Sequence, residues 1–512
     1  MAINIYLEIE RLVQYAKDKS LIKKEDYIYA KNRVLEALGL DDYEEIEVEK
    51  ETLTSPVEIL DNILNWAYEN DRLEHNTPIY RDLLDTKIMN CFMPRPSEVI
   101  RVFYEDYEED PKKATDYYYE MSKNSNYIRT DRIAKNKVWK TKTIYGDLDI
   151  TINLSKPEKD PKAIEKAKNI KKTSYPKCLL CKENEGYAGR INHPARQNHR
   201  IIPIELKNEP WFFQYSPYVY YNEHSIIFKD KHEPMKITKE TFDRLLEFVE
   251  KFPHYFIGSN ADLPIVGGSI LSHDHFQGGN YEFSMAKAPI EKSFTFHQSP
   301  NIEGGIVKWP MSVIRLRGEN REEISKLAGI ILKKWKNYTD EEAEIRAYTN
   351  EIPHNTITPI ARRREHYFEL DLVLRNNRTS KEHPLGIFHP HNQVHHIKKE
   401  NIGLIEVMGL AVLPPRLKEE LEKLAKYLLN ENLPIEKEEI LQKHLEWFHY
   451  LKEKYPKMNE KEVHDILKEE VGKKFMTVLE HAGVFKRDIK GQQAFMKFLK
   501  KINNPIHKLQ RG

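Results

Sequence analysis

The sequence predicts an α+β protein, and three observations lead to this prediction. Apolar residues recur at helical spacing at both ends of the chain, in residues 1–120 and 416–512. Between these ends, short apolar or alternating runs typical of strands dominate. In this central part the order strand, helix, strand, strand occurs once, and a similar series follows. No residues literally repeat, so only the order of elements indicates a duplication.

The composition predicts a cytoplasmic protein with more than one structural unit. Its 512 residues are enough for several cores. The 81 basic and 80 acidic residues give a net charge of +1, whereas a general nucleic-acid binder needs a basic excess. Three cysteines cannot cross-link so long a chain, so a reducing interior is expected. The N-terminal stretch contains acidic residues, unlike a signal peptide, and no apolar run reaches membrane-spanning length.

The first region, residues 1–120, is expected to be mostly helical. Its apolar residues are spaced as on amphipathic helices: Ile3, Leu7, Ile9, Leu12, Val13 and Tyr15, and later Ile59, Leu60, Ile63, Leu64 and Trp66. We interpret both stripes as core-facing. Two prolines interrupt the pattern within Met93–Ser97 before it restarts at Glu98.

The second region, residues 121–300, opens with a polar segment that carries Arg129 and Arg132. Two arginines at this spacing can clamp a phosphate, and a salt-bridged surface loop is the alternative. Gly146–Leu154 alternates as a strand does. Lys156–Lys172 is expected to be a charged helical connector.

The first α+β series follows in the same region. Ser225–Phe228 is predicted to be a strand, and Thr238 or Thr241 is expected to cap the helix that comes next. His254–Gly258 is predicted to be a second strand. The series ends at Gly267–Gly279, with the sequence GGSILSHDHFQGG.

This last stretch carries the candidate nucleophile. Alternate side chains of a strand share a face, so His273, His275 and Gln277 are expected on one surface. The flanking glycine pairs let the backbone bend or approach a ligand. Two imidazoles and an amide beside such a backbone suit phosphoryl transfer through a histidine nucleophile. Taken alone, the pattern also fits a structural zinc site or a half-exposed strand.

The third region, residues 301–415, is expected to form the second α+β series, and residues 416–512 are expected to be supporting amphipathic helices. The predicted elements of the third region are a strand at Val313–Leu316, a helix at Glu322–Tyr338, a strand at Tyr367–Leu374 and an apolar strand at Ile402–Pro414.

Cys178 and Cys181 have the spacing of a zinc knuckle. A four-coordinate site needs two further ligands, and His232 and His273 are the best candidates because they lie in strand or strand-end contexts. Two buried free thiols are the alternative. A redox pair is less favoured because no thioredoxin-like context surrounds the cysteines. A metal on His273 would anchor the strand beside His275.

A second histidine run, His389–His396, competes for the catalytic role because it has the same His-x-His-x-Gln spacing. It lacks the flanking glycine pairs, and its prolines and polar surroundings predict an exposed loop. We rank its histidines second as nucleophiles. They are alternatively contacts to substrate or to a second metal, or they have neither role.

Six runs spread over nearly the whole chain support one interpretation together. They are Leu84–Met89, Pro94–Ser97, Asn192–Arg200, Tyr215–His224, Gly267–His275 and Ile397–Gly409. In combination they resemble the second class of bacterial galactose-1-phosphate uridylyltransferases. The likeness extends from the N-terminal helices to the Gly483–Arg487 tail.

The resemblance implies a histidine-triad-like fold: two fused half-barrel units with antiparallel sheets, extended by N-terminal and C-terminal helices. It implies that His275 is the nucleophile and that Gln277 hydrogen-bonds a phosphoryl oxygen. It places a structural zinc on Cys178, Cys181, His232 and His273. It implies substrate contacts by Arg129 and Arg132 to the nucleotide, by Asn260, Gly268 and Ser269 near the phosphate, and by Lys399 and Glu406 to phosphate and hexose.

The sequence departs from the first class of these enzymes at two places. Asp274 replaces a proline between the paired histidines, so the strand is expected to differ locally. The first class also has an iron site with paired histidines. Glu291 and His354 fit positions of that site, but Glu369 and Asp371 stand in place of the pair, and no iron is expected.

The implied reaction transfers UMP from UDP-glucose to galactose 1-phosphate through a uridylyl-histidine. Neutral imidazole attacks without a separate base, and the Gln277 amide cannot deprotonate water, which favours transfer over hydrolysis. The alternatives are another nucleotidyltransferase, a dinucleoside-polyphosphate phosphorylase or hydrolase of the same superfamily, or a non-catalytic zinc-stabilised binding protein. UDP-sugars and hexose 1-phosphates are the expected partners, without nucleic acid, membrane or organic cofactor, and a homodimer is compatible with the sequence.

Overall fold

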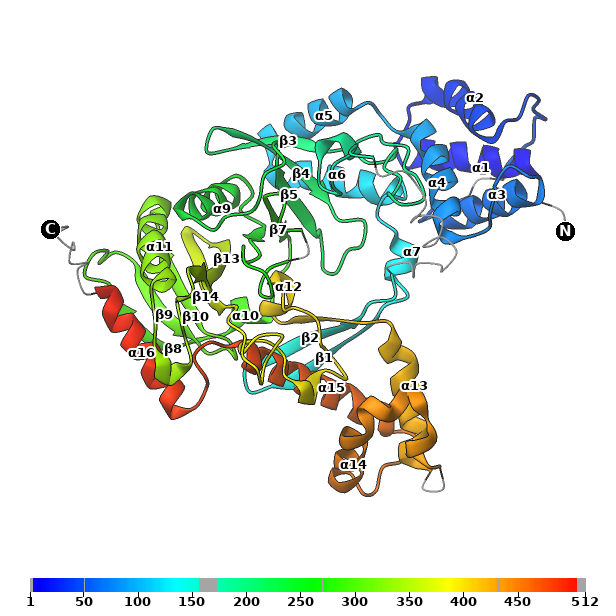
Figure 1. Cartoon of the computed structure of the whole chain (residues 1–512). Helices are drawn as coiled ribbons and strands as arrows, with labels where there is room; N and C mark the ends of the chain where they lie inside the picture. Colours follow the sequence, from blue (N-terminus) through cyan, green and yellow to red (C-terminus); the bar gives the residue numbers. More distant parts are fainter. Residues whose placement is uncertain (1–2, 50, 156–172, 269, 431–432, 504–512) are drawn as a thin grey trace. The chain divides into compact units, whose positions relative to one another are not determined.

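The computed structural model describes residues 3–49, 51–155, 173–268, 270–430 and 433–503 (Figure 1). The predicted connector Lys156–Lys172 and the candidate Ser269 lie outside the described residues. Contacts divide the chain into two compact units, and each unit is assembled from separate stretches. The first contains Met1–Lys135, Ser155–Glu233 and His273–His275, and the second contains Asn136–Leu154, Pro234–Ser272 and Phe276–Gly512.

The first unit begins with helices and ends with a small antiparallel sheet. Its helices are α1 (Ile5–Asp18), α2 (Tyr27–Leu38), α3 (Val57–Glu69), α4 (Pro78–Met89), α5 (Pro96–Glu109), α6 (Pro111–Asn124) and α7 (Thr130–Ile133), with short 3₁₀ turns η1 (Lys24–Asp26), η2 (Asn90–Phe92) and η3 (Lys182–Asn184). Its strands pair antiparallel in the order β3 (Ile202–Leu206), β4 (Glu209–Tyr215), β5 (Ser225–Lys229). The prediction of N-terminal helices is confirmed.

Aromatic side chains join the helices of the first unit to its sheet. Tyr118 of α6 lies 5.6 Å from Phe213 and 4.9 Å from Tyr215 of β4, measured between ring centroids. All three residues are buried. The Tyr215 hydroxyl donates a hydrogen bond to the Thr115 carbonyl oxygen at 3.1 Å. Because large aromatic rings bury much apolar area, this cluster is a main part of the unit's core.

The second unit contains most of the strands. Its strands are β1 (Lys137–Thr143), β2 (Gly146–Ile152), β6 (Phe256–Gly258), β7 (His275–Gly279, whose first residue is assigned to the first unit), β8 (Ile290–Thr295), β9 (Glu303–Val307), β10 (Val313–Gly318), β11 (Tyr348–Thr349), β12 (Ile352–Pro353), β13 (Asn355–Arg364), β14 (Tyr367–Asn376) and β15 (Leu410–Leu413). Its helices are α9 (Lys239–Lys251), α10 (Ser284–Lys287), α11 (Arg321–Lys336), α12 (Leu404–Val407), α13 (Arg416–Leu429), α14 (Leu445–Lys454), α15 (Val463–Ala482) and α16 (Ile489–Asn503), with 3₁₀ turns η4 (Glu341–Ala343), η5 (Asn392–Val394), η6 (Ile435–Lys437) and η7 (Glu439–His444).

Antiparallel pairing dominates the second unit. Its main sheet has the order β7-β6-β13-β14-β10-β9-β8, and every neighbouring pair is antiparallel. A smaller sheet joins β1, β2 and β15, and β15 runs parallel to β2. Together with the first unit, this arrangement confirms the α+β class with antiparallel sheets. The division into residues 1–120, 121–300, 301–415 and 416–512 remains a prediction.

Helices α9 and α11 pack beside each other against β13 (Figure 1). The fully buried Trp335 of α11 donates from its indole nitrogen to the Thr356 carbonyl oxygen of β13 at 2.8 Å. At the start of α9, the Thr238 backbone N–H donates to the Thr241 hydroxyl at 3.1 Å. Thr238 is the N-cap, one of the two residues predicted for that role.

Two strand predictions are wrong in detail. The central strand β7 begins only at His275, so His273 lies in the irregular segment before it. The stretch Ile402–Pro414 is not one strand, because the short helix α12 precedes β15. In α12, the Gly403 backbone N–H donates to the Glu406 carboxylate at 2.8 Å. This local cap makes a helical turn from residues whose apolar character alone predicts a strand.

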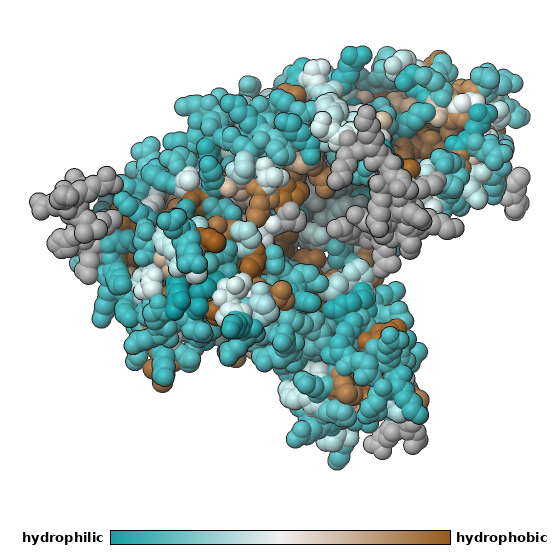
Figure 2. Space-filling model, viewed as in Figure 1, coloured by the Kyte–Doolittle hydropathy of each residue, from teal (hydrophilic) through white to brown (hydrophobic). Residues whose placement is uncertain are grey.

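The view in Figure 2 shows a mostly hydrophilic surface with smaller hydrophobic areas. Within the described residues, no helix has the combination of length and apolarity that a membrane crossing requires.

Candidate functional site

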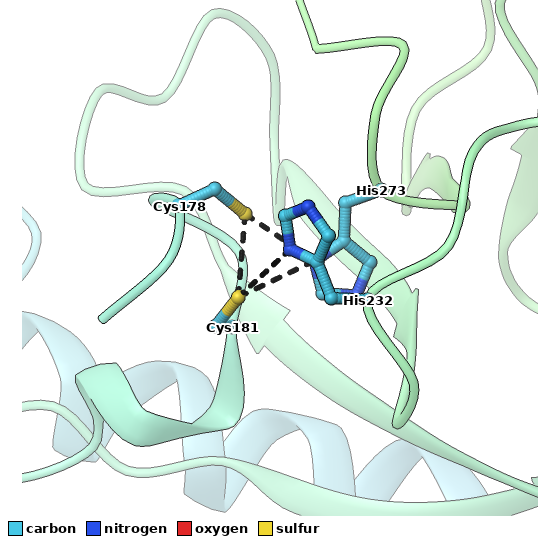
Figure 3. A group of neighbouring side chains, drawn as sticks. All are labelled: Cys178, Cys181, His232 and His273. Atoms are coloured by element: carbon cyan, nitrogen blue, oxygen red, sulfur yellow. Dashed lines mark hydrogen bonds between the residues drawn. The ribbon is translucent and has the colours of Figure 1, made fainter. Parts of the chain in front are cut away.

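The four predicted metal ligands come together in the first unit. Cys178 and Cys181 lie in the turn before η3, His232 follows β5, and His273 lies two residues before β7 begins. Their ligand atoms all lie within 4.8 Å of one another. Figure 3 shows the four side chains turned toward one another.

Four of the six distances between these atoms are close to those of a tetrahedral site. The Cys178 and Cys181 sulfurs are 3.5 Å apart, and His273 Nδ1 is 3.3 Å and 3.7 Å from them. His232 Nδ1 is 3.1 Å from the Cys181 sulfur. Zinc bonds of about 2.3 Å to sulfur and 2.0–2.1 Å to nitrogen put tetrahedral ligand atoms roughly 3.4–3.8 Å apart. The donor set therefore fits a zinc ion.

Hydrogen bonds around the cluster hold the ligands in orientations suited to metal binding. His273 Nε2 donates to the Lys229 carbonyl oxygen at 2.7 Å. The proton is therefore on Nε2, and the lone pair of Nδ1 faces the two sulfurs. The Asn184 amide donates to the carbonyl oxygens of Cys178 and Cys181, each at 2.8 Å. The Leu180 backbone N–H lies 3.4 Å from the Cys178 sulfur. The turn is thus fixed from outside the four side chains.

The protein alone does not favour a thiolate at Cys181. Burial raises the pKa of this thiol to about 12, with a smaller contribution from Cys178. Burial also lowers the pKa of His273. A bound metal ion shifts the equilibrium of such a thiol toward the thiolate, because the metal binds the deprotonated form.

His275, the candidate nucleophile, is held by the chain that carries His273. Its Nδ1 lies 2.8 Å from the His273 carbonyl oxygen and donates to it. The ring is therefore the Nδ1–H tautomer, and the nucleophilic lone pair is on Nε2. Burial lowers the pKa of His275 to about 4, so the ring is neutral at pH 7. The backbone of Asp274, between the two histidines, bonds to Glu233 and Lys229 at 2.7 and 3.0 Å.

Gln277 lies two residues beyond His275 on the same strand, so both side chains share a face of β7. In the second unit Gln277 lies opposite Gly258 of β6, which in turn lies opposite Ile360 of β13. Ile360 lies opposite Asp371 of β14. The face that carries Gln277 therefore continues across the sheet to Asp371.

The predicted nucleotide contacts Arg129 and Arg132 are paired with carboxylates of α4. Arg129 donates to Asp85 at 2.5 Å, and Arg132 donates to Asp82 at 3.0 Å. Both arginines are salt-bridged, as the alternative interpretation expected, but Arg129 is buried and does not lie on an exposed loop. A role in nucleotide binding remains a prediction.

Three candidate residues of the second unit meet around α12. The Asn260 side-chain oxygen accepts the Leu404 N–H at 2.9 Å, and the Glu406 carboxylate accepts the Gly403 N–H at 2.8 Å. A Cβ atom on Gly268 would lie only 2.7 Å from the Asn260 amide nitrogen. Gly268 is therefore needed for close packing against Asn260.

Lys399 is exposed, and its backbone N–H donates to the Glu400 carboxylate at 3.2 Å. The preceding residue, Lys398, is buried, and its ammonium group donates to the Glu406 carboxylate. Sequence reasoning missed Lys398. The adjacent lysines are indistinguishable by local pattern, and only the tertiary fold decides which one is buried.

Glu369 and Asp371 occupy the positions at which the first class of these enzymes has the paired histidines of its iron site. In this chain both carboxylates bind arginines. Asp371, fully buried, accepts from Arg315 at 2.7 and 2.9 Å and from Arg362 at 2.8 Å. Glu369 accepts from Arg362 at 2.8 Å and from Arg364 at 3.0 Å. Glu291 and His354 fit the other two positions of the iron site. Glu291 accepts a hydrogen bond from Arg487, and His354 is hydrogen-bonded to Asn377.

The prediction of an exposed loop for the second histidine run holds for Asn392 and Gln393 and is wrong for its histidines. His389 and His396 are buried. His391 stacks on His481 of α15, with ring centroids 4.3 Å apart. Its Nε2 donates to the Ile387 carbonyl oxygen at 2.9 Å. A helix distant in sequence covers this run, which local composition does not reveal.

Comparison with known proteins places both halves of the chain in a single family. The galactose-1-phosphate uridyl transferase N-terminal domain matches residues 20–234, and the C-terminal domain matches residues 247–449. Both halves are thus those of a uridyl transferase.

Relatives with this name match almost end to end. A galactose-1-phosphate uridylyltransferase of Halalkalibacterium halodurans is 61% identical over 503 residues, 98% of this chain and 99% of its own. Those of Clostridium acetobutylicum and Bacillus subtilis are 57% and 53% identical, over 96% and 99% of this chain and 99% and 100% of their own lengths. The chain belongs to the galactose-1-phosphate uridylyltransferase family.

Among solved structures, the yeast Ap4A phosphorylase Apa2 in complex with AMP matches 63% of this chain and 91% of its own. The identity is 10% and the TM-score is 0.32. A similarity this low supports no argument about function.

Proposed function

We propose that this chain transfers UMP from UDP-glucose to galactose 1-phosphate, giving UDP-galactose and glucose 1-phosphate. The observation that carries this proposal is the state of His275. Its Nδ1 donates to the His273 carbonyl oxygen, and burial lowers its pKa to about 4, so Nε2 offers a lone pair at neutral pH. The names of the relatives point to the same activity.

The reaction has two displacements. In the first, His275 Nε2 attacks the α-phosphorus of UDP-glucose, and the bond from that phosphorus to the bridging oxygen breaks, which releases glucose 1-phosphate. In the second, a phosphate oxygen of galactose 1-phosphate attacks the same phosphorus, and the bond to Nε2 breaks. UDP-galactose leaves and the neutral imidazole is restored. Gln277, on the same strand face, donates a hydrogen bond to a phosphoryl oxygen in both steps.

The remaining candidates have supporting roles in this proposal. Arg129 and Arg132 contact the nucleotide, Asn260, Gly268 and Ser269 lie near the phosphates, and Lys399 and Glu406 contact phosphate and hexose. UDP-sugars and hexose 1-phosphates are the substrates. A cytoplasmic location and a homodimer remain predictions.

We also propose that the Cys178, Cys181, His232 and His273 cluster holds a structural zinc ion. Four protein ligands fill a tetrahedral zinc, so the ion stabilises the fold and offers no open position to substrate. The match between the observed sulfur and nitrogen spacings and tetrahedral zinc supports this assignment.

An exchange assay tests the activity. The purified chain is incubated with UDP-glucose labelled in the uridylyl group, and the acid-labile adduct is mapped by mass spectrometry. We expect the label on His275, and its transfer to galactose 1-phosphate on addition of that substrate. His275→Gly should lose several orders of magnitude in transfer rate, as expected for a covalent nucleophile.

His391→Ala is the matched control, because His391 has the same His-x-His-x-Gln spacing. It should retain most of the activity. An adduct on His391, or normal transfer by the His275 variant, would contradict the proposal. Hydrolysis or phosphorolysis of a dinucleoside polyphosphate, without transfer to the hexose phosphate, would favour the other superfamily activity.

A further inference from the structure

A buried lysine lies beside the candidate hexose contact in the second unit. Lys398 is 5% exposed, and its ammonium group donates to Oε1 of Glu406 and, at 3.1 Å, to the Val412 carbonyl oxygen of β15. Glu400 lies farther away, with its carboxylate 3.8 Å from the same nitrogen. A buried ammonium group is costly unless its donors are satisfied. The position of Lys398 is therefore fixed by the Glu406 carboxylate and the β15 backbone.

The Glu406 carboxylate is held from two sides. Lys398 donates to Oε1, and the Gly403 backbone N–H donates to Oε2 at 2.8 Å. Both contacts come from the protein and occupy one lone-pair direction on each oxygen. A carboxylate has about four such directions. A carboxylate oxygen that accepts one hydrogen bond from the protein can therefore accept a second from a ligand.

A second buried cation, Arg375, faces the same segment. Arg375 donates to the Ile402 carbonyl oxygen at 2.9 Å and to the Thr358 hydroxyl at 3.3 Å. Burial lowers its pKa to about 10, and the charge of Glu406 opposes that shift. Two buried cations therefore lie near one carboxylate. A carboxylate that is paired with an ammonium group accepts hydrogen bonds, so a matching ligand group is a donor such as a sugar hydroxyl.

We propose that Lys398 is a positioning residue, which holds the Glu406 carboxylate in the orientation that accepts a hydrogen bond from a hydroxyl group of the hexose 1-phosphate. The proposal rests on the proposed function. Lys398 does not touch the sugar and acts through Glu406. Loss of the Lys398 charge should therefore weaken recognition of one hydroxyl group more than it weakens transfer in general.

The test compares galactose 1-phosphate with its four deoxy analogues, each lacking the hydroxyl at position 2, 3, 4 or 6. The assay measures kcat/KM for transfer from UDP-glucose by the full chain. The wild type should prefer the parent over one analogue by roughly 10- to 100-fold, the usual strength of a hydrogen bond to a charged group. Glu406→Gln should reduce the preference at that same position, which identifies the hydroxyl that Glu406 reads.

Lys398→Met should reduce the preference at that position to below about 3-fold and leave the preferences at the other positions unchanged. Lys398→Arg retains the charge but changes the donor geometry, so it should give a preference between those of the wild type and the Met variant. Lys426→Met, an exposed position on α13, is the control and should behave as the wild type. If Lys398→Met does not fold, the hydroxyl preference of Lys398→Arg is used to test whether Lys398 positions Glu406.

Three results would overturn the proposal. The first is an equal loss of kcat/KM for the parent and every analogue in the Lys398 variants, which is the signature of a merely structural role. The second is an unchanged preference in Lys398→Arg. The third is a wild type that transfers UMP but discriminates at no hydroxyl. Failure of the proposed function looks different, because the wild type would then transfer no UMP to galactose 1-phosphate.

Discussion

Cys181→Ser tests the metal cluster most directly. The substitution replaces a sulfur that lies 3.5 Å from the Cys178 sulfur and 3.1 Å from His232 Nδ1 with a smaller and harder oxygen. The backbone contacts that hold the turn, including those from Asn184, are left in place. The variant therefore removes one ligand and retains the scaffold that presents the other three.

The size of the effect follows from the number of ligands. Structural zinc sites in small peptides bind with about 10–16 kcal/mol at neutral pH. One ligand of four then accounts for roughly 2.5–4 kcal/mol, which corresponds to an affinity loss of about 60- to 700-fold. Because the proposed zinc has a structural role, transfer by the protein that remains folded should fall by much less than the metal affinity.

Zinc affinity is measured by competition with a chromogenic chelator, and zinc content by mass spectrometry of the purified protein. Cys91→Ser is the matched control, since Cys91 is a half-buried cysteine outside the cluster. It should bind zinc as the wild type does. The reasoning fails if Cys181→Ser has wild-type zinc affinity, or if freshly purified wild type contains no zinc.

Three further predictions concern the second unit. Asp371→Asn removes the fully buried carboxylate that pairs with Arg315 and one of the two carboxylates that pair with Arg362, so it should lower the free energy of unfolding by about 3–5 kcal/mol in urea titrations, and a loss below about 1 kcal/mol would contradict this. Gly268→Ala should displace Asn260 and reduce kcat/KM for transfer by roughly 10- to 100-fold. The control Gly329→Ala, on α11, should keep the wild-type kcat/KM. If the Gly268 variant is as active as this control, Gly268 is only a turn residue. Burial lowers the pKa of His481 from 6.5 to about 3, so its contribution to stability is complete above pH 6.5 and is lost as the pH falls toward 3. In His481→Gln, the free energy of unfolding should therefore fall less steeply than in the wild type as the pH is lowered from about 6.5 to 4. An equal slope in both proteins would contradict this prediction.

Elements with a clear local signal are predictable from the sequence. The alternating or apolar runs at Ser225–Phe228, Val313–Leu316 and Tyr367–Leu374 are strands, and Thr238 caps the helix that follows it. In each case the periodicity or the cap involves neighbouring residues only. The Cys/His cluster was also predictable, because Cys178 and Cys181 are close in sequence and His232 and His273 are histidines in strand or strand-end contexts.

The remaining features depend on contacts between distant parts of the chain. His391 is half-buried because it packs against α15, about ninety residues further along the chain. The buried state of Lys398, and not Lys399, depends on Glu406 and the β15 backbone. The shortened strand before His275 reflects the position of His273, which must reach Cys178 and Cys181. None of these constraints leaves a periodic signature.

The first unit closes late during synthesis, because its last piece, His273–His275, follows residues 234–272 of the second unit. His273 lies 92 residues after Cys181. At about 5–20 residues per second, a ribosome needs roughly 5–18 seconds to cover that distance. His232 is added 51 residues after Cys181, so the nascent chain has at first only the two thiols and then three donors, and it lacks the fourth until His273 is made. Newly made protein is therefore most vulnerable to thiol oxidation or capture of a wrong metal before residue 273 emerges.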